Sequence, residues 1–306
     1  MKTIYLGKSD LKVPVVAAGC MRIDGLSDRE LTAFIDNALE QGCNFFDHAD
    51  IYGGGSCHKR FGEAVKTMGL KREDYILQSK CGIVPGKMFD FSKEKILSSV
   101  DGILKDLQTE YLDVLLLHRP DELFEPEEVA EAFDTLQQSG KVRHFGVSNQ
   151  RTMRIRLMQK YVHQPIVANQ LQFSVMNASM ISSSIETNMA TPGAVDRDGS
   201  ILDFCRLEDI TVQAWSPFQY GFFEGVFLNN EKFPKVNRVI DELAEKYNVT
   251  NTTIASAWIL RHPANIQLIS GTTKPGRFTE ICQAAGIRLT REEWYRIYMA
   301  AGNMLP

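Results

Sequence analysis

The sequence predicts a closed (β/α)8 barrel of eight parallel strands, with an N-terminal β-hairpin before it and extra helices near the C-terminus. From Val15 onward, short apolar runs alternate with amphipathic helical patterns, which is typical of a parallel sheet. The run Leu112–Leu117 is almost entirely apolar, as expected for a strand buried on both faces. No linker, internal repeat or change of composition interrupts the alternation. We therefore expect residues 1–306 to form one barrel domain.

Each expected strand is a short run of apolar and β-branched residues between turn or helix signals. Two extended pieces, Ile4–Leu6 and Leu11–Val13, flank a turn at residues 7–10 and predict the hairpin. The barrel strands are expected, in order, at Val15–Cys20, Asn44–Asp47, Tyr75–Lys80, Leu112–Leu117, Val142–Val147, Ile166–Gln170, Thr211–Trp215 and Ile266–Ser270.

The helices are predicted by apolar residues at helical spacing and by their end signals. Ser27 with Glu30, and Thr290 with Glu293, have the spacing of capping boxes. Pro126 suits the first turn of a helix, because its missing N–H is not needed there. The expected helices are Ser27 to Gly42, Ser56–Met68, Ser92–Leu107, Pro126–Gln138, Arg151–Lys160, Ser200–Arg206, Lys235–Lys246, Thr252–Arg261, Gly276–Ala285 and Arg291–Ala301.

Two connections, 172–199 and 217–234, are long. Both follow strands, so both should lie at the C-terminal face of the barrel, where loops of this length are usually functional or mobile. The second connection either packs against its own helices or forms a wall over a site. Its aromatic residues are Phe218, Tyr220, Phe222, Phe223, Phe227 and Phe233.

Composition and charge exclude several functional classes. The chain has 306 residues, a net charge of −4 and a pI near 5.9, so it lacks the basic character of a nucleic-acid or anionic-membrane binder. A local basic pocket for a phosphate remains compatible with this charge. No stretch has the length and apolarity of a signal peptide or membrane span, and a cytoplasmic location is expected. The six cysteines form no CxxC pair and are expected to be reduced and mostly buried.

Polar side chains stand where seven of the expected barrel strands end. In a parallel barrel the active site lies at the C-terminal ends of the strands, so these side chains should share one mouth. Each residue alone has a plain structural explanation, such as a helix cap or a solvated lysine, but their joint placement favours a site. The strand ends are Asp47, Lys80, His118, Ser148 with Asn149, Gln170, Trp215 with Ser216, and Ser270 to Thr272.

Three of these groups, together with Tyr52 from the loop after Asp47, suit proton transfer to a developing alkoxide. Lys80 needs a carboxylate such as Asp47, because an unpaired buried ammonium is costly. A protonated Lys80 beside the Tyr52 hydroxyl would stabilise the phenolate and lower the pKa of Tyr52, which would make it a proton donor near neutral pH. His118 could orient a substrate oxygen. No spacing suits a metal site, and Gly53–Gly55 predict a loop hinge rather than a dinucleotide fingerprint.

A cofactor would occupy the second half of the barrel. Ser148, Asn149 and Gln170 offer partners for a carboxamide, and Trp215 offers a flat face for an aromatic ring. Ser270 to Arg277 leads into a helix N-terminus, which attracts anions through its dipole and free N–H groups. Lys274 and Arg277 add cationic donors for a phosphate.

Taken together, these residues resemble the aldo-keto reductase family over nearly the whole chain. The resemblance is strongest to the bacterial oxidoreductase branch, whose members lack a long C-terminal substrate loop. The stretches that carry it are Leu6–Val13, Phe46–Gly53, Ser79–Lys80, Leu115–Asp121, Gly140–Arg143, Phe145–Asn149, Asn169–Gln170, Ala214–Pro217 and Gly271–Pro275.

The resemblance implies NAD(P)H-dependent reduction of aldehydes or ketones to alcohols. It implies that Tyr52 is the acid, with Lys80 tuning its pKa, Asp47 pairing with Lys80 and His118 orienting the substrate. Hydride would pass from the nicotinamide C4 as Tyr52 protonates the carbonyl oxygen. The implied cofactor contacts are Ser148, Asn149 and Gln170 with the carboxamide, Trp215 with the nicotinamide ring, Ser216 and Pro217 with the pyrophosphate, and Gly271, Thr272, Thr273, Lys274 and Arg277 near the adenosine phosphate.

The chain departs from the family pattern at two places. Trp215 stands where many members stack a tyrosine, and Gly271 with Thr272 stand where many carry a lysine and a serine. One cation is therefore missing, while Lys274 and Arg277 remain, so NADPH (bound as the NADP cofactor) is expected in preference to NADH.

Two other functions stay open on the sequence. One is a redox-sensing module that binds the cofactor and turns over negligibly, and the other is an aldolase-type enzyme with Lys80 as a Schiff-base nucleophile. The expected partner is a small-molecule carbonyl compound, selected by Met21, Arg22, Phe89 and the two long connections. The sequence does not indicate an oligomeric state.

Overall fold

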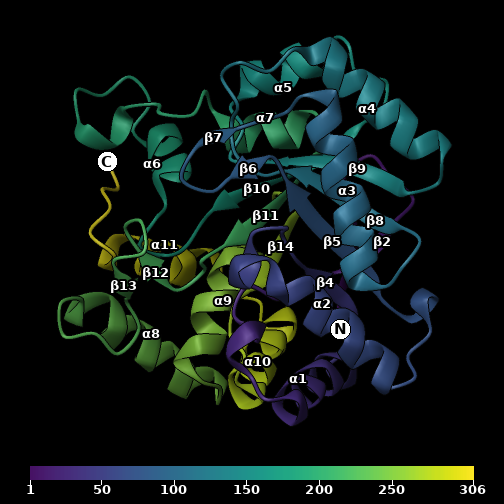
Figure 1. The fold of residues 1–306 in the computed structure, drawn as a ribbon. Coiled ribbons are helices and arrows are strands. Elements are labelled where there is room, and N and C mark those ends of the chain that lie inside the picture. The colour runs from purple at the N-terminus through teal and green to yellow at the C-terminus, as the bar shows by residue number, and fades with distance from the viewer.

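The computed structural model describes residues 1–306 and contains a closed barrel of eight parallel strands (Figure 1). The strands follow one another around the barrel in chain order, and pairing of the last strand with the first closes it. The (β/α)8 prediction is confirmed. In order, the strands are β3 (Val16–Gly19), β4 (Phe45–Asp47), β5 (Ile76–Cys81), β8 (Leu112–Leu117), β9 (Val142–Ser148), β10 (Ile166–Gln172), β11 (Thr211–Trp215) and β14 (Ile266–Ser270).

Helices pack around the outside of this barrel (Figure 1). Both predicted capping boxes are present: Ser27 accepts from the Glu30 N–H and Thr290 accepts from the Glu293 N–H. The helices between and after the strands are α1 (Asp28–Glu40), α2 (Ser56–Thr67), α3 (Lys93–Leu107), α4 (Pro126–Gln138), α5 (Thr152–Gln159), α7 (Ile201–Leu207), α8 (Pro234–Tyr247), α9 (Asn251–Arg261), α10 (Pro275–Gln283) and α11 (Arg291–Ala300).

The long connections hold short elements that the sequence did not predict. Residues 172–199 include α6 (Ser179–Ile185), and residues 217–234 include a hairpin of β12 (Gln219–Tyr220) and β13 (Gly225–Val226). A third small hairpin, β6 (Ile83–Val84) with β7 (Met88–Phe89), follows β5. Strands of two residues are too short to show the alternation by which a strand is recognised.

The apolar residues form two separate clusters. The larger one fills the space between the strands and the helices, as in any layered α/β fold. The smaller one lies inside the barrel and includes Leu6 and Val13 from the predicted hairpin, together with Phe45, Ile76 and Leu116 from the strands. The hairpin, β1 (Thr3–Tyr5) with β2 (Lys12–Pro14), therefore closes the N-terminal end of the barrel with apolar side chains.

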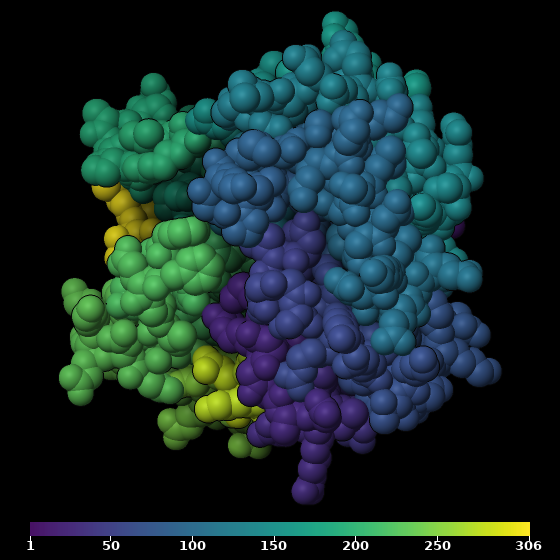
Figure 2. Space-filling view, viewed as in Figure 1, coloured from purple at the N-terminus to yellow at the C-terminus, as the bar shows by residue number.

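The opposite end of the barrel is open. Figure 2 shows a hollow on this face, between the green surface of the 217–234 connection and the blue surface that follows β5. All six cysteines are free and buried, as predicted. No helix has both the length and the apolar character needed to cross a membrane.

Candidate active site

A cavity of about 610 Å³ opens at the C-terminal ends of the barrel strands. All of the predicted site residues except Lys80 line it, and Lys80 lies directly beneath the lining. The residues that the sequence places at strand ends are therefore brought together at one mouth. The predicted residues in the lining are Asp47, Tyr52, His118, Ser148, Asn149, Gln170, Trp215, Ser216, Pro217, Gly271, Thr272, Thr273, Lys274 and Arg277.

Lys80 links the carboxylate and the phenol at the bottom of this cavity. Its Nζ lies 2.8 Å from Asp47 Oδ1, and it donates to Tyr52 Oη at 3.0 Å and to the His48 carbonyl at 2.7 Å. The side chain is fully buried. Burial alone would lower the pKa of Lys80, but the charges of Asp47 and Tyr52 and the hydrogen bonds to them together outweigh burial and raise that pKa above the ordinary value. Lys80 is thus held as an ammonium ion.

The loop after β4 brings Tyr52 back over Lys80. Two backbone hydrogen bonds, from His48 N to Gln78 O and from Asp50 N to Lys80 O, tie this loop to β5. The three glycines that follow Tyr52 have backbone φ values of 57°, 63° and 97°, which residues with a Cβ rarely adopt. These angles explain why glycines stand here, and the loop hinge stays a prediction.

The pKa of Tyr52 differs from the sequence-based expectation. Burial raises the pKa of the Tyr52 phenol above its ordinary value, and the ammonium of Lys80 lowers it by a smaller amount. The prediction that Lys80 lowers this pKa is right for that one contact and wrong for the sum, because desolvation of the phenolate is the larger effect. Tyr52 therefore stays protonated at neutral pH.

His118 follows the end of β8 and faces Tyr52. The ring centroids of the two residues are 6.1 Å apart, with their planes nearly perpendicular. Burial, reinforced by the charges of Lys80 and Arg119, lowers the pKa of His118 well below its ordinary value. The imidazole is therefore neutral at neutral pH, and its buried Nδ1 has no hydrogen-bond partner. A neutral ring of this kind can donate one hydrogen bond to a substrate oxygen.

Four buried glutamines at the bottom of the cavity form a hydrogen-bonded ladder, of which the sequence predicted only Gln170. Strand alternation turns Gln78 into the barrel two positions before Lys80, opposite Asp47 in the β4–β5 register. Gln170, Gln213 and Gln267 are paired in register across β10, β11 and β14. Gln78 Nε2 donates to Asp47 Oδ1 at 2.6 Å, and Gln170 Nε2 donates to the same oxygen at 3.1 Å.

The two ends of this ladder fix the direction of every amide. At the lower end, Gln267 Nε2 must donate to the Pro14 carbonyl, so its Oε1 accepts from Gln213 Nε2. At the upper end, the carboxylate of Asp47 only accepts, so the amide nitrogens of Gln78 and Gln170 must face it. Gln213 Oε1 accepts from both of those nitrogens. The side-chain oxygen of Gln170, Oε1, is thereby left without a protein donor.

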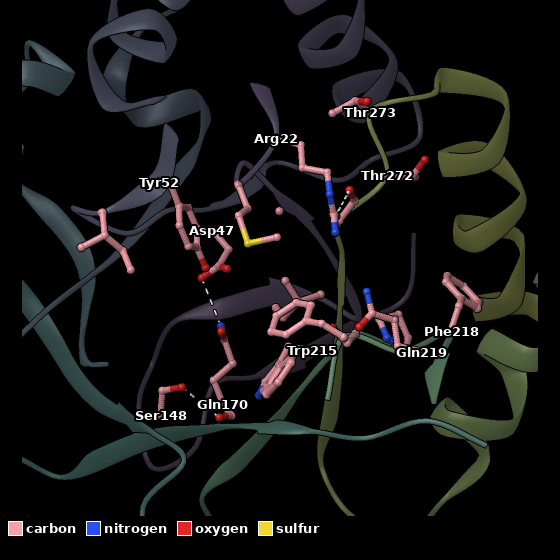
Figure 3. Close-up of a pocket in the computed structure, with 18 of the residues that line it drawn as sticks. Arg22, Asp47, Tyr52, Ser148, Gln170, Trp215, Phe218, Gln219, Thr272 and Thr273 are labelled. Atoms are coloured by element: carbon pink, nitrogen blue, oxygen red, sulfur yellow. Dashed lines mark hydrogen bonds between the residues drawn. The ribbon is translucent and has the colours of Figure 1, made fainter. Parts of the chain in front are cut away.

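The residues predicted to contact a carboxamide and an aromatic ring lie together in the cavity. Figure 3 shows Ser148, Gln170 and Trp215 below Tyr52 in the view. Ser148 Oγ donates to the backbone carbonyl of Gln170 at 3.0 Å and accepts from Asn149 Nδ2 at 2.8 Å. Trp215 Nε1 donates to Asn149 Oδ1 at 3.2 Å, which fixes the orientation of the indole. Phe223 from the β12–β13 hairpin stacks on Trp215 with ring centroids 5.8 Å apart.

The loop between β14 and α10 forms the far wall. Figure 3 places Thr272 and Thr273 on the side of the cavity opposite Tyr52. Lys274 is the residue before α10, whose first N–H groups have no side-chain cap. Arg277 lies on the first turn and its Cζ is 5.1 Å from the Phe218 ring. Free N–H groups and two cations at a helix N-terminus are a suitable site for an anion.

Several expectations about substrate contacts need correction. Met21 and Arg22 line the cavity, but Phe89 does not, because β7 turns it towards solvent with 44% of its surface exposed. The 217–234 connection contributes Phe218, Gln219, Phe223 and Val226 to the lining, whereas 172–199 contributes nothing. The aromatic connection is thus a wall of the cavity, as one of its two interpretations held.

Burial raises the pKa of two further side chains near the site, Cys57 and Asp50. Cys57 is buried, and burial raises the pKa of its thiol, which disfavours a reactive thiolate. Asp50 remains a loop carboxylate, with burial raising its pKa to about 6.

The Aldo/keto reductase family model matches residues 15–301 of the chain. The chain belongs to the aldo/keto reductase family. It is 36% identical over 313 residues to the uncharacterized oxidoreductase YcsN of Bacillus subtilis, with 98% of each chain covered. It is 27% identical to the NADH-specific methylglyoxal reductase of Escherichia coli, with 95% of each covered.

A crystal structure of the thermostable aldo-keto reductase Tm1743 with the inhibitor epalrestat shares this fold. The two chains are 26% identical, with a TM-score of 0.79, and the match covers 98% of this chain and 100% of the other. This aldo-keto reductase therefore has the family's barrel over its whole length, and it is an oxidoreductase of a family that uses nicotinamide cofactors.

Proposed function

We propose that this aldo-keto reductase, acting as one domain over residues 1–306, uses NADPH to reduce aldehyde or ketone carbonyls to alcohols. The observation that carries the proposal is the contact of the Lys80 ammonium with both Asp47 and Tyr52 at the bottom of the cavity. A partly buried phenol held by an ammonium is suited to give a proton to an oxygen that becomes negative.

The cavity fits a nicotinamide cofactor on three observations. Gln170 Oε1 faces the cavity region without a protein donor, so it is free to accept from a carboxamide N–H group. The indole of Trp215 is fixed by Asn149 and offers an aromatic surface. The N-terminus of α10, with Lys274 and Arg277, suits a phosphate on the opposite side. Ser216 and Pro217 lie between the two.

In the proposed reaction the bound cofactor supplies a hydride from its nicotinamide C4. Tyr52 would give its hydroxyl proton to the substrate oxygen, while Lys80 stabilises the phenolate that forms. The neutral imidazole of His118 would donate a hydrogen bond to the same oxygen and orient the carbonyl. Asp47 keeps Lys80 charged and does not itself contact the substrate.

A preference for NADPH rests on the cations near α10. Lys274 and Arg277 provide two positive charges where a 2′-phosphate would lie, although Gly271 and Thr272 replace a lysine and a serine of many family members. The relative that is NADH-specific shows that the family also accepts the other cofactor. Comparing kcat/KM for NADPH and NADH, with methylglyoxal among the carbonyl substrates, tests the preference directly.

The acid role is tested with Tyr52→Phe. We expect kcat for aldehyde reduction to fall at least about 100-fold, in line with the usual contribution of a general acid, while NADPH still binds. The wild-type rate should stay constant through neutral pH and fall only above the raised pKa of Tyr52, because reduction needs the protonated phenol. Tyr298→Phe, which removes a buried hydroxyl outside the cavity, is the matched control. Unchanged turnover in Tyr52→Phe would refute the role of Tyr52.

The two alternatives have their own tests. The three hydrogen bonds of Lys80 and its raised pKa oppose a Schiff-base nucleophile, and a lack of borohydride trapping on Lys80 would exclude one. A redox-sensing module would oxidise one equivalent of bound NADPH and then stop, so single-turnover and steady-state rates separate it from a reductase. The cytoplasmic location stays a prediction, to be checked by cell fractionation.

A further inference from the structure

The charges that line the cavity are unbalanced. Asp47 is the only acidic residue in the lining, and Lys80 neutralises it from below. Four cations face the same space: Arg22, Arg119, Lys274 and Arg277. The phosphates of the proposed cofactor would neutralise the cations that lie near them. A cation far from the phosphates would need a second anion to neutralise its charge, so the position of each cation matters.

Three of the four cations lie on the phosphate side. Lys274 and Arg277 follow β14, and Arg22 Nη1 donates to the Gly271 carbonyl of the same loop at 3.0 Å. Arg119 follows β8, directly after His118. In the closed ring of eight strands β8 is four strands away from β14, so Arg119 stands across the barrel mouth from α10. It therefore lies at the reacting end of the cavity.

The Arg119 guanidinium has no protein partner of opposite charge. It makes no hydrogen bond and no ion pair, although the residue is partly buried, and burial lowers its pKa. Its Cζ lies 5.7 Å from the Trp215 ring and 5.8 Å from the Phe222 ring, within the range of cation–π contacts. Cation–π contacts use none of the five N–H donors of the guanidinium in a hydrogen bond, so all five remain available.

We propose that Arg119 binds a carboxylate of the substrate, so that this reductase favours oxo acids, aldehydes or ketones that also carry a carboxylate group. A planar carboxylate can take two parallel hydrogen bonds from the guanidinium and supplies the missing negative charge. It would hold the substrate with its carbonyl towards Tyr52 and His118, the residues beside Arg119 at this end of the cavity. The inference rests on the proposed carbonyl reduction at the same site.

The test compares each acid with its own methyl ester at a fixed cofactor concentration. Two pairs of different length are used: succinate semialdehyde and 4-carboxybenzaldehyde, each with its methyl ester. For at least one pair we expect kcat/KM to be about tenfold or more higher for the acid than for its ester, because hydrogen bonds to a charged group contribute at least that much to binding. Arg119→Gln should reduce that ratio about tenfold, mainly through KM, and Arg119→Lys should retain part of it.

Arg22→Gln is the matched control, since it removes one guanidinium from the other side of the same mouth. Its acid-to-ester ratio should stay within about twofold of the wild type, because screening weakens charge effects across a solvent-filled opening. The inference is overturned if both esters are used as well as their acids, or if Arg119→Gln leaves the ratio unchanged. It is also overturned if Arg22→Gln lowers the ratio as much as Arg119→Gln does.

A binding measurement separates this inference from the proposed function. The Kd of 4-(hydroxymethyl)benzoate, the alcohol product, is measured by calorimetry on the NADP-bound protein and on its Arg119→Gln variant. About tenfold weaker binding to the variant supports the carboxylate contact even if no aldehyde is reduced, and then the proposed function alone has failed. Equal binding to both proteins refutes the contact whatever the turnover.

Discussion

The floor and the rim of the cavity are built in opposite ways. The floor, formed by Asp47, Lys80 and the glutamines of the ladder, is buried, and each of its side chains makes a hydrogen bond to another. The rim, formed by the β12–β13 hairpin and the loop 271–277, is partly exposed, and Phe222 and Phe223 have 65% and 50% of their surfaces in solvent. Floor side chains bond to one another, whereas the rim cations Lys274 and Arg277 make no protein ion pair.

This difference matches what each part would do in the proposed reaction. Proton transfer needs donors held in place before the substrate arrives, because reorganisation during the reaction would add to the barrier. A site for varied substrates and a departing cofactor needs side chains that can move and whose polar groups are free. We therefore expect substitutions in the floor to lower kcat and stability together, and substitutions in the rim to alter KM.

Asp47→Asn should have the largest effect. The amide would face Gln78, Gln170 and Lys80, which are all donors, and Lys80 would lose its counter-charge. We expect kcat to fall about 100-fold or more. Breaking a buried ion pair on one side should lower the free energy of unfolding by about 3–5 kcal/mol. Steady-state kinetics and urea unfolding measure the two effects.

Asp113→Asn provides the control for that prediction. Asp113 is also buried and paired, with Arg72 at 2.6 Å and Arg143 at 3.3 Å, but it lies near the start of β8, away from the cavity. The Asp113→Asn substitution should lower the free energy of unfolding without lowering kcat in the protein that remains folded. If Asp47→Asn changed kcat no more than Asp113→Asn, the floor would be a structural feature alone.

Gln213→Leu should have an intermediate effect, because it removes the middle of the ladder. It leaves Gln78 Oε1 and Gln267 Oε1 without their donor, which should cost about 1–3 kcal/mol for each unpaired buried group. It also frees the Gln170 amide to rotate, so kcat should fall about tenfold through misplacement of the carboxamide contact and Asp47. Unfolding and single-turnover hydride transfer measure these changes.

Gln164→Leu is the matched control for the ladder. Gln164 is a buried amide that donates to Asp134 and Gln137 outside the barrel interior. The Gln164→Leu substitution should lower the free energy of unfolding about as much as Gln213→Leu does, with kcat unchanged. A fall in kcat equal to that of Gln213→Leu would mean that any loss of a buried amide slows the enzyme, and the positioning role of the ladder would be wrong.

The sequence predicted the barrel and the mouth because their signals are local. Strand alternation with helices, and a polar residue at the end of each apolar run, are visible within short windows, so the sequence alone could place Asp47, Lys80, His118 and Gln170 at one mouth. In the structure Asp47 is the last residue of β4 and His118 directly follows β8, whereas β5 and β10 continue past Lys80 and Gln170 to Cys81 and Gln172. All four strands belong to one closed ring that follows chain order.

The ladder could not be predicted in the same way. Gln78, Gln213 and Gln267 lie within strands that the sequence shows as mostly apolar, and their bonding depends on register across the barrel, which no local pattern encodes. A signal did exist: each glutamine interrupts a buried run, and a buried amide needs partners. The unpartnered state of Arg119 likewise became visible only with the three-dimensional arrangement.

Phe223→Ala should have the smallest effect and tests the rim alone. The ring contacts Trp215 from a hairpin that is half exposed, so its loss should change stability by no more than about 0.5 kcal/mol, as is usual for surface substitutions. An aromatic pair is worth about 0.5–1.5 kcal/mol, so KM for the cofactor should rise about two- to fivefold with kcat nearly constant. Phe89→Ala, an exposed phenylalanine outside the cavity, should change neither value. A large loss of kcat in Phe223→Ala would mean that the rim, like the floor, must be fixed before the reaction, and the contrast between the two would not hold.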